Sequence, residues 1–520
     1  MNGAQAVART FADCGVTTCF ANPGTSEMHF VAALDTVPEL RGVLCLFEGV
    51  ATGAADGYGR MTGRPAAALL HLGPGLANGL ANLHNARRAR TPLLAIVGDH
   101  ATYHKRFDAP LESDIDALAG SVSGWVRRIA RSCDAGSDAA EAVAAALRAP
   151  GQVATLILPA DVTWTEGGGI AAPVAPRLPT PVPGEVIRDA AAALRSGEPA
   201  VILLGGTALR RLALQAASRA ARATGARLLA ETFAARHERG AGIPPVDRLA
   251  YLVEMAASQL DGTRHLILAG ATAPVSFFAY PDKPSTPVPP GCQVHVLAEP
   301  ADDVPGALAA LADLVGGGQA PGSPQPPRPE RPGLPDGELT AQTAAGVIGA
   351  LLPDGAVVCD EANTSGIWLP AATASAPPHD WLSLTGGAIG QGLPLATGAA
   401  VACPDRPVLA LEADGSAMYT ASALWTHARE QLDITTVIFS NRAYAILTME
   451  LERTGAPASG SAARDLLDLS RPDIDFTALA AGMGVPASRA TTAADFAAQL
   501  RHAFAEPGPH LIEAAMPPRG

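Results

Sequence analysis

The sequence predicts an α/β protein made of three consecutive doubly wound parallel-sheet domains. Short apolar runs rich in Val, Ile and Leu alternate with Ala-rich helical runs, which is the pattern of parallel sheets covered by helices. The 520 residues suffice for about three domains of ordinary size. Two Pro- and Gly-rich stretches, 166–184 and 316–337, predict extended connectors. We therefore expect domains at 1–165, 185–315 and 338–520.

In the first domain, a polar residue follows each of three predicted strands. Ser26 lies in the turn after the first strand, Glu48 directly follows the second, and His71 directly follows the third. Glu48 opens a run of small residues, 49–57, that predicts a helix able to pack very closely against a sheet or a partner helix. The alternatives are a helix-stabilising carboxylate for Glu48 and a buried, hydrogen-bonded imidazole for His71.

The central segment contains the apolar runs 201–204, 265–269 and 294–297, which predict a Rossmann-like sheet. No Gly-x-Gly-x-x-Gly follows the first of these strands. A bound dinucleotide such as FAD is therefore not supported by the sequence.

In the third domain, a carboxylate and an amide follow two predicted strands that flank one helix. Asp414 lies where the apolar run 408–411 gives way to a Gly turn, and Asn441 follows the run 434–439. In a strand–helix–strand unit both strand ends open on the same edge of a parallel sheet, where ligands bind. Two hard oxygens, with N–H groups and a hydroxyl from Gly415-Ser416, suit Mg²⁺ holding a diphosphate. Asp-Gly turns are also common in α/β proteins without a cofactor.

The pair Asp414-Gly415 and Asn441 resembles the signature of thiamine-diphosphate (ThDP) enzymes. Further segments are similar to enzymes of the acetolactate synthase large subunit and benzoylformate decarboxylase type, namely 22–27, 48–58, 71–79, 386–394 and 422–426. These motifs occur in family order over nearly the whole chain. Ala413 replaces the first Gly of the signature, which is tolerable where the backbone does not need a positive φ.

The resemblance implies a pyrimidine-binding, a central Rossmann-like and a diphosphate-binding domain, in that order. It implies that Glu48 activates ThDP through its aminopyrimidine ring, and that Ser26 and His71 contact the substrate carboxylate and relay protons. The implied Mg²⁺ ligands are Asp414, Asn441 and the main-chain oxygen of Ala443. The implied cofactor-binding residues are Gly387, Ile389, Gly415, Ser416, Asn363 and Thr364, of which Ile389 could also be a core residue and Asn363 and Thr364 solvated loop residues.

Other parts of the family pattern are missing. The second active-site His of benzoylformate decarboxylases would fall near 277–280, which holds no His. The paired His of pyruvate decarboxylases are absent from 108–114, and Leu111 stands at the Gln typical of acetolactate synthases. His100 and His104 lie on the nearby loop and are candidate replacements.

The implied reaction is the ThDP- and Mg²⁺-dependent decarboxylation of a 2-oxo acid, followed by carboligation of the resulting enamine to an aldehyde or a second oxo acid. Slow protonation lengthens the life of the enamine, so the missing relay histidines favour carboligation. The alternatives are a simple 2-oxo acid decarboxylase and a non-catalytic ThDP-binding relative. Because the family assembles each site between subunits, the resemblance also implies a homodimer or homotetramer.

Composition excludes several other classes of function. The net charge is −13 and no Lys/Arg cluster is visible, so neither nucleic acid nor a membrane surface is an expected partner. Seven Cys without a Cys-x-x-Cys pair, and a start (1–15) without an apolar core, predict a cytoplasmic protein without a signal peptide. The uncharged segment 381–404 holds several Gly and Pro, which favours a ligand-binding loop and helix over a membrane span.

Aromatic residues gather in two loops of a chain that is only 4% aromatic. This concentration predicts a mainly apolar acyl pocket and a preference for branched or aromatic 2-oxo acids over pyruvate. The residues are Tyr103, Phe107, Phe277, Phe278 and Tyr280. The alternative is that they are core or interface residues.

Overall fold

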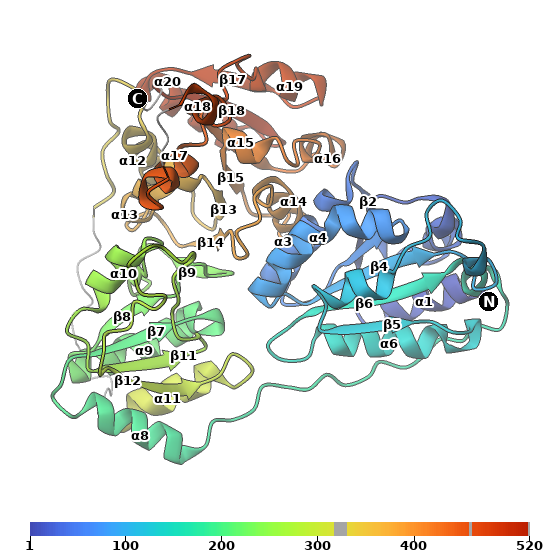
Figure 1. The fold of residues 1–520 in the computed structure, drawn as a ribbon, viewed down its shortest axis with the longest axis horizontal. Coiled ribbons are helices and arrows are strands. Elements are labelled where there is room, and N and C mark those ends of the chain that lie inside the picture. Colours follow the sequence, from blue (N-terminus) through green and yellow to red (C-terminus); the bar gives the residue numbers. More distant parts are fainter. Residues whose placement is uncertain (317–329, 457–459, 518–520) are drawn as a thin grey trace.

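The computed structural model describes residues 1–316, 330–456 and 460–517. It contains three α/β domains, each built on its own sheet of mainly parallel strands, as the sequence predicts (Figure 1). The first connector, 166–184, is largely without regular structure, and α8 begins at its end. The second, 316–337, falls largely outside the described residues.

The N-terminal sheet has six parallel strands in the order β2-β1-β3-β4-β6-β5. Its strands are β1 (Thr18–Ala21), β2 (Arg41–Leu44), β3 (Ala67–Leu70), β4 (Leu93–Asp99), β5 (Trp125–Arg128) and β6 (Val153–Pro159). Its helices are α1 (Gly3–Asp13), α2 (Met28–Ala33), α3 (Glu48–Thr62), α4 (Leu72–Ala89), α5 (Ile115–Gly120), α6 (Ala135–Ala146) and α7 (Ala160–Trp164). The strand before Glu48 ends at Leu44, earlier than the sequence pattern suggests.

The central sheet has five parallel strands in the order β10-β8-β7-β11-β12. Its strands are β7 (Ala200–Leu204), β8 (Arg227–Ala230), β10 (Asp247–Arg248), β11 (His265–Ala269) and β12 (Gln293–Ala298), and its helices are α8 (Gly184–Leu194), α9 (Arg211–Thr224), α10 (Val253–Leu260) and α11 (Val304–Leu314). The ends of β7 and β11 are packed backbone to backbone, because a Cβ at Gly205 would lie 2.8 Å from the Gly270 oxygen.

The C-terminal sheet has seven strands in the order β17-β18-β16-β15-β13-β14-β9. Its strands are β13 (Val357–Glu361), β14 (His379–Ser383), β15 (Val408–Ala413), β16 (Ile434–Ser440), β17 (Ala487–Ala490), β18 (His510–Ala515) and β9 (His237–Arg239). Its helices are α12 (Ala341–Leu351), α13 (Leu369–Ala372), α14 (Gly392–Ala402), α15 (Asp414–Ala417), α16 (Ala423–Arg429), α17 (Ala445–Arg453), α18 (Ser461–Asp465), α19 (Phe476–Gly482) and α20 (Ala493–Ala505). Strand β9 comes from the central segment of the chain and pairs antiparallel with β14. Sequence patterns did not predict this crossing, because so short a strand has no periodicity of its own.

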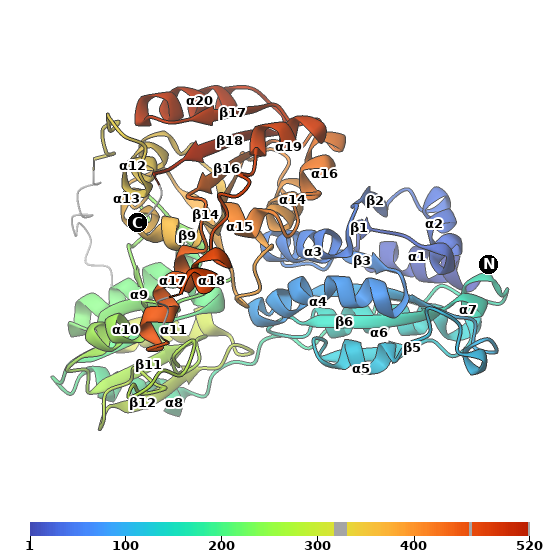
Figure 2. The ribbon, with the colours of Figure 1, turned by 45° about the horizontal axis from the view of Figure 1, so that its top comes forward.

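Helices α3 and α14 join the N- and C-terminal domains and lie side by side in both ribbon views (Figures 1 and 2). Their contact depends on small residues: a Cβ at Gly53 would lie 2.5 Å from Pro394, and one at Gly57 would collide with the Leu395 oxygen. One buried apolar cluster runs through this contact and includes Val50 from α3. The two sheets therefore share a continuous core.

The uncharged segment 381–404 forms part of β14, a loop and α14. Within the described ranges, no helix combines the length and the apolar character that a membrane crossing requires.

Candidate functional site

Asp414 and Asn441 lie beyond the carboxyl ends of two neighbouring strands. β15 and β16 are parallel, with Ala413 opposite Phe439, so Asp414 and, two residues past Phe439, Asn441 lie at the same edge of the sheet. Asp414 is 3% exposed and Asn441 is 6% exposed. Asp414 accepts hydrogen bonds from the N–H groups of Gly415 at 2.8 Å and Arg442 at 2.6 Å. The arrangement leaves a carboxylate and an amide together, which suits a hard cation with oxygen ligands.

Burial raises the pKa of Asp414 above its usual value, although main-chain N–H groups oppose this effect. A cation beside the carboxylate would favour its charged form. Among the described residues, no group of three or more His, Cys, Asp or Glu is placed to hold a metal ion. The edge therefore offers one carboxylate and neutral oxygens, a donor set that fits Mg²⁺ carrying a diphosphate better than it fits zinc.

The residue that departs from the family signature causes no backbone strain. Ala413 has φ −81° and ψ 149°, an extended conformation that any residue adopts. Gly415, by contrast, has no room for a side chain, because a Cβ there would collide with the Tyr444 ring. Ser416 is buried and its hydroxyl donates to the Ala413 oxygen at 3.0 Å.

The predicted cofactor loop 386–391 precedes α14. Gly387 (φ 76°) and Gly390 (φ 91°) take left-handed conformations, and Ile389 is half-buried between them. Asn363 is exposed and Thr364 half-buried, both at the start of a 3₁₀ helix after β13. The loop, Asn363 and Thr364 belong to the C-terminal domain, as do Asp414 and Asn441.

From the sequence Glu361, like Asn363 and Thr364, is a candidate to line the diphosphate or a solvated loop residue, but the structure gives it a different role. Its side chain is buried and accepts hydrogen bonds from the N–H groups of Gly390 at 2.7 Å and Gly392 at 2.5 Å, so it fixes the end of the cofactor loop. Burial raises the pKa of Glu361 to about 7. Burial and the neighbouring Glu361 carboxylate together raise the pKa of Glu412 well above its usual range.

Glu48 is the first residue of α3 and is 6% exposed. The Asn78 amide donates to its Oε2 at 3.0 Å, while Gly75 leaves space beside Oε1, where a Cβ would lie 3.1 Å away. Glu48 therefore presents one oxygen to the space in front of Gly75.

Ser26 and His71 meet at the end of the N-terminal sheet, around a third residue. The Ser26 hydroxyl lies 3.2 Å from His71 Nδ1 and donates to Glu27 at 2.5 Å. His71 Nδ1 also lies 2.9 Å from Glu27 Oε2. The Glu27 side chain is fully buried against Gly98, where any side chain would collide with it.

Sequence reasoning missed Glu27. Its carboxylate accepts a hydrogen bond from the Gly24 N–H at 2.8 Å, so its spacing from Gly24 looks like an ordinary turn cap. The structure shows that the same carboxylate also contacts the His71 imidazole, with Oε2 2.9 Å from Nδ1. The sequence feature that could have indicated this role is the acidic residue directly after Ser26.

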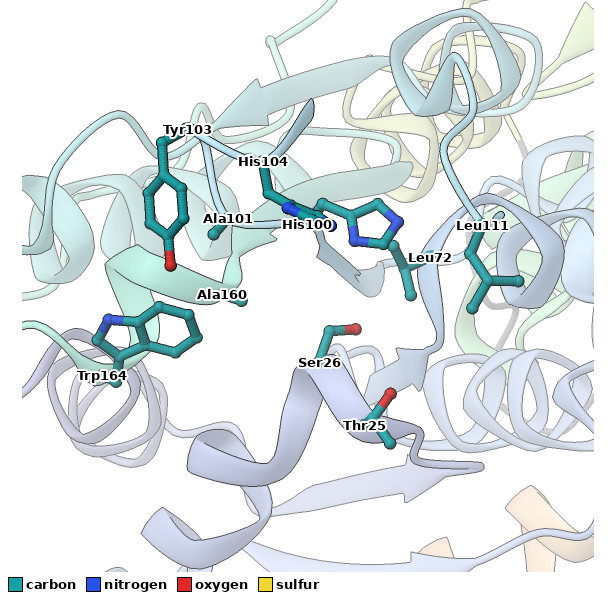
Figure 3. Close-up of a pocket in the computed structure, with 10 residues that line it drawn as sticks. All are labelled: Thr25, Ser26, Leu72, His100, Ala101, Tyr103, His104, Leu111, Ala160 and Trp164. Carbon is teal, nitrogen blue, oxygen red and sulfur yellow. The ribbon is translucent and has the colours of Figure 1, made fainter. Parts of the chain in front are cut away.

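A pocket of about 300 Å³ opens beside Ser26 at this edge of the sheet (Figure 3). His100 and His104 point into the space above Ser26, with their ring centres 5.6 Å apart. Tyr103 and Trp164 lie on the opposite side of the same space. The two imidazoles, which the sequence offered only as possible replacements, are thus brought next to the Ser26–His71 pair.

The predicted aromatic acyl pocket is only partly present within one chain. Of its residues only Tyr103 lines the pocket of Figure 3. Phe107 lies beside His104 with the two rings tilted by 47°, whereas Phe277 packs against the cofactor loop, where a Cβ at Gly387 would lie 2.6 Å from its ring. Tyr280 lies under the guanidinium of Arg453. The aromatic residues therefore belong to separate clusters.

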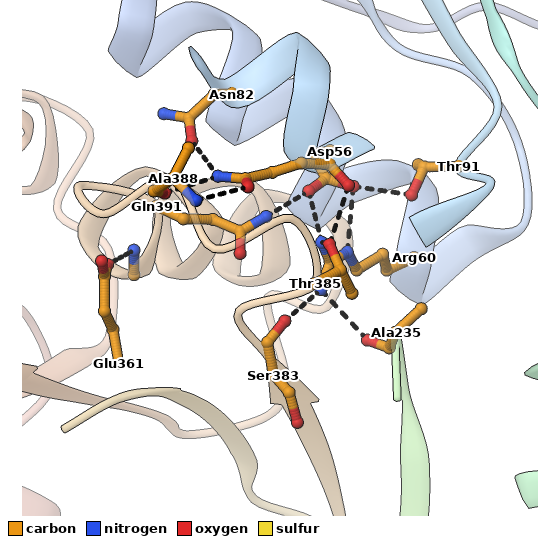
Figure 4. A network of polar contacts seen from close by, with 12 residues as sticks. Asp56, Arg60, Asn82, Thr91, Ala235, Glu361, Ser383, Thr385, Ala388 and Gln391 are labelled. Atoms are coloured by element: carbon orange, nitrogen blue, oxygen red, sulfur yellow. Dashed lines mark hydrogen bonds and ion pairs between the residues drawn. The ribbon is translucent and has the colours of Figure 1, made fainter. Parts of the chain in front are cut away.

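A buried polar network ties the cofactor loop to the other two domains (Figure 4). Arg60 pairs with Asp56 at 2.6 Å and donates to the main-chain oxygens of Ser383 at 2.7 Å and Ala235 at 3.2 Å. Asp56 also accepts from the Gln391 amide at 2.7 Å. One fully buried ion pair thus holds the N-terminal, central and C-terminal domains together beside the loop.

Two family models match the chain. Residues 1–119 match the thiamine pyrophosphate enzyme N-terminal TPP binding domain, and residues 362–514 match the C-terminal TPP binding domain. Thiamine pyrophosphate is the same compound as ThDP. The two matched segments contain Ser26, Glu48 and His71 in one case and Asp414 and Asn441 in the other.

Relatives match over almost their whole length. The chain is 64% identical over 519 residues, 99% of both proteins, to the Mycobacterium tuberculosis protein named "Putative acetolactate synthase large subunit IlvX". It is 28% identical to a Pseudomonas aeruginosa benzoylformate decarboxylase over 96% of both. A Rhodococcus jostii ThDP-dependent 4-hydroxybenzoylformate decarboxylase shares the fold with a TM-score of 0.85 at 24% identity, over 100% of both chains. The chain therefore belongs to the thiamine pyrophosphate (ThDP) enzyme family, as an enzyme of the acetolactate synthase and benzoylformate decarboxylase type.

Proposed function

We propose that this enzyme decarboxylates a 2-oxo acid with ThDP and Mg²⁺ and transfers the remaining acyl unit to an aldehyde or a second 2-oxo acid. The observation that carries the proposal is that a buried Asp414–Asn441 edge coexists with a buried Glu48 that keeps one oxygen free. The name of the 64% identical relative supports acyl transfer as the outcome.

The proposal assigns the diphosphate end of the cofactor to the C-terminal domain. Asp414, Asn441 and the main-chain oxygen of Ala443 would hold Mg²⁺. Gly415, Ser416, Asn363 and Thr364 would face the diphosphate, while Gly387 and Ile389 would contact the rings. When bound, ThDP supplies an electron sink for breaking a bond next to a carbonyl, which amino-acid side chains cannot supply.

The N-terminal domain would supply the groups that move protons. Glu48 Oε1 would exchange a proton with the aminopyrimidine ring, while Asn78 keeps Oε2 in place. Ser26 and His71 would bind the substrate carboxylate. Glu27 would orient His71, since the buried carboxylate contacts only one of its two ring nitrogens.

A specific observation favours a second candidate function, simple decarboxylation. His100 and His104 line the pocket beside Ser26 and could deliver the proton that releases an aldehyde.

The experiment that separates these candidates is a panel of 2-oxo acids with ThDP and Mg²⁺, with and without an aldehyde acceptor. Products are identified by mass spectrometry. A joined product supports the proposal, an aldehyde alone supports simple decarboxylation, and the absence of carbon dioxide release from every acid contradicts both.

We further propose a homodimer or a larger assembly of dimers, in which Glu48 and Asp414 of different subunits face one cofactor. Large apolar side chains are exposed next to the cofactor residues, as a subunit interface requires. They are Ile367 (60% exposed), Trp368 (46%), Met418 (42%) and Tyr419 (57%). Mixing Glu48→Gln and Asp414→Ala chains should restore roughly a quarter of the activity, because half of the dimers would be hybrids with one intact site. An active monomer in light scattering would contradict this arrangement.

The proposal places the enzyme in the cytoplasm. The seven cysteines are all free thiols in the structure, as expected in a reducing compartment. The domain limits 1–165, 185–315 and 338–520 remain a prediction, with β9 as the one strand that crosses from the second segment to the third sheet.

A further inference from the structure

The pocket beside Ser26 has walls of unusual composition for an acidic chain. The protein carries a net charge of −13, yet none of the described residues that line this pocket is Asp or Glu. Its polar groups are the imidazoles of His100 and His104, the hydroxyls of Thr25, Ser26 and Tyr103, and the indole of Trp164. All of these groups can donate a hydrogen bond, although the Ser26 hydroxyl already donates to Glu27 at 2.5 Å. The walls are therefore suited to a ligand rich in acceptors.

One ring nitrogen in the pocket wall has no partner among the described residues. His100 Nε2 is buried and, in the described part of the chain, forms no hydrogen bond. In Figure 3 the His100 ring lies over the pocket, next to Leu72. Buried polar atoms without a partner are rare in folded proteins, so each one marks a place where a ligand or an ordered water is expected.

The loop that carries both imidazoles is fixed by charged groups outside the pocket. Asp99, which is 1% exposed, accepts from the His100 N–H at 2.7 Å and pairs with Lys105 at 3.1 Å and with Arg128. Lys105 also pairs with Glu112 at 2.5 Å, at the far end of the loop. Asp99 and Glu112 are thus paired with Lys105 and Arg128 outside the pocket, and the histidine positions are set before any ligand binds.

We propose that this pocket binds a carboxylate other than the one on the reacting 2-oxo group, with His100 as its main donor and His104 beside it. This proposal rests on the proposed function, which places the reacting carboxylate at Ser26 and His71. The second carboxylate has two possible sources. It belongs either to the far end of a dicarboxylic 2-oxo acid or to a second 2-oxo acid that accepts the acyl unit.

The pocket composition also changes the expected substrate preference. An apolar acyl pocket would favour branched or aromatic side chains, but the aromatic residues that predicted it lie in separate clusters. Two imidazoles and three hydroxyls favour an anionic end group instead. We therefore expect the enzyme to prefer a substrate with an additional carboxylate over a branched or aromatic 2-oxo acid.

Equilibrium binding tests the proposal without turnover. The protein, loaded with ThDP and Mg²⁺ and labelled with ¹⁵N in its histidine rings, is titrated with glutarate and, separately, with pentanamide, which has the same chain length and no carboxylate. The His100 signal is identified by its absence from the His100→Gln variant. We expect saturable shifts of this signal with glutarate at concentrations at least about tenfold below those needed with pentanamide, the difference that one charge-assisted hydrogen bond supplies. Equal responses to the two compounds would overturn the proposal.

Kinetics then distinguish the two sources. For a donor substrate, 2-oxoglutarate is compared with 2-oxopentanoate, which has the same chain length and lacks the far carboxylate. If the far end of the donor occupies the pocket, His100→Gln raises KM about tenfold or more for 2-oxoglutarate alone. If the acceptor occupies it, the same variant raises KM for a 2-oxo acid acceptor but not for an aldehyde acceptor. Unchanged KM values in both comparisons would contradict the proposal.

A matched control and a separate readout protect the interpretation. The control variant is His502→Gln, the same chemical change in the C-terminal domain, where the ring centres of His502 and His510 lie 5.8 Å apart. It should change neither comparison. If no 2-oxo acid is turned over, the proposed function fails, while the glutarate titration of the unmodified protein still decides whether the pocket binds a carboxylate.

Discussion

The C-terminal and N-terminal sheets both carry their candidate site residues at the carboxyl ends of parallel strands, but they hold these side chains in different ways. At the C-terminal edge, Asp414 and Asn441 are held by main-chain N–H groups within a few residues of each motif. At the N-terminal edge, side chains from separate strands hold one another, as Glu27 holds His71. The first edge is held by main-chain donors, one of them from the neighbouring strand end, and the second by side chains. Substitutions should therefore act on cofactor binding at the first edge and on proton movement at the second.

The largest effect is expected for Asp414→Ala. This change removes the one carboxylate at the proposed metal edge, so the diphosphate loses its bridging cation. Calorimetry with ThDP and Mg²⁺ should then show no binding at concentrations that saturate the unmodified protein. Asp405→Ala, which changes the same residue type in the turn after α14, should bind normally. Undiminished affinity of Asp414→Ala would remove the metal assignment.

A smaller but still large effect is expected for Glu48→Gln at the other edge. Gln keeps the size and the contact with Asn78 but cannot exchange a proton as a carboxylate does. ThDP should bind with nearly normal affinity, while deuterium exchange at the thiazolium C2 position slows by about a hundredfold or more. NMR after acid quench measures the exchange. An unchanged exchange rate would leave Glu48 with only its helix-stabilising role.

These two edges also differ in how far the sequence predicts them. Asp414 and Asn441 stand in contiguous motifs at strand ends, so their neighbourhood follows from the strand–helix–strand unit alone. Ala413 was a visible departure, and its extended backbone explains why a methyl is accepted there. The three-sheet fold was likewise predicted, because the alternation of strand and helix runs is a local property.

The features that the sequence did not reveal depend on distant contacts. Glu27 resembles a turn cap until Gly98 of β4 is seen to leave space for it. Glu361 resembles a loop residue until the N–H groups of Gly390 and Gly392 are placed against it. The separation of Phe277 from Tyr103 could not be predicted either, since it depends on how the domains are packed.

An intermediate effect is expected for Glu27→Gln, which sharpens the comparison within the N-terminal edge. The amide keeps its volume in the space beside Gly98 but no longer offers His71 a charged partner. We expect kcat/KM for the best 2-oxo acid to fall about tenfold to hundredfold, the effect of a hydrogen bond to a charged group, with ThDP affinity unchanged. ¹⁵N spectra of the His71 ring should show a changed tautomer or protonation state. Glu39→Gln, at a more exposed carboxylate of the same domain, is the matched control. A loss of ThDP binding instead would show that Glu27 supports the cofactor and not the imidazole.

The smallest effect concerns the pH dependence of stability and tests whether His427 is excluded from water in the folded protein. His427 in α16 is fully buried, its Nε2 lies 2.8 Å from the Thr397 hydroxyl, and burial lowers its pKa to about 4. The unfolded chain has a His pKa near 6.5. Between pH 6.5 and 4 the imidazole is therefore protonated in the unfolded state but not in the folded state. Stability should therefore fall by about 1.4 kcal/mol for each pH unit below 6.5, and this contribution is absent above that pH.

The variant that isolates this contribution is His427→Gln, which retains a side chain able to contact the Thr397 hydroxyl but does not titrate. It should be less stable than the unmodified protein at pH 7.5, because the packing of α16 against α14 is disturbed. The difference in urea midpoint between the two proteins should then shrink as the pH is lowered from 6.5 to 5, since only the unmodified protein loses the contribution of His427. A constant difference for His427→Gln would contradict this prediction, because it would mean that folded and unfolded chains take up the proton at His427 over the same pH range.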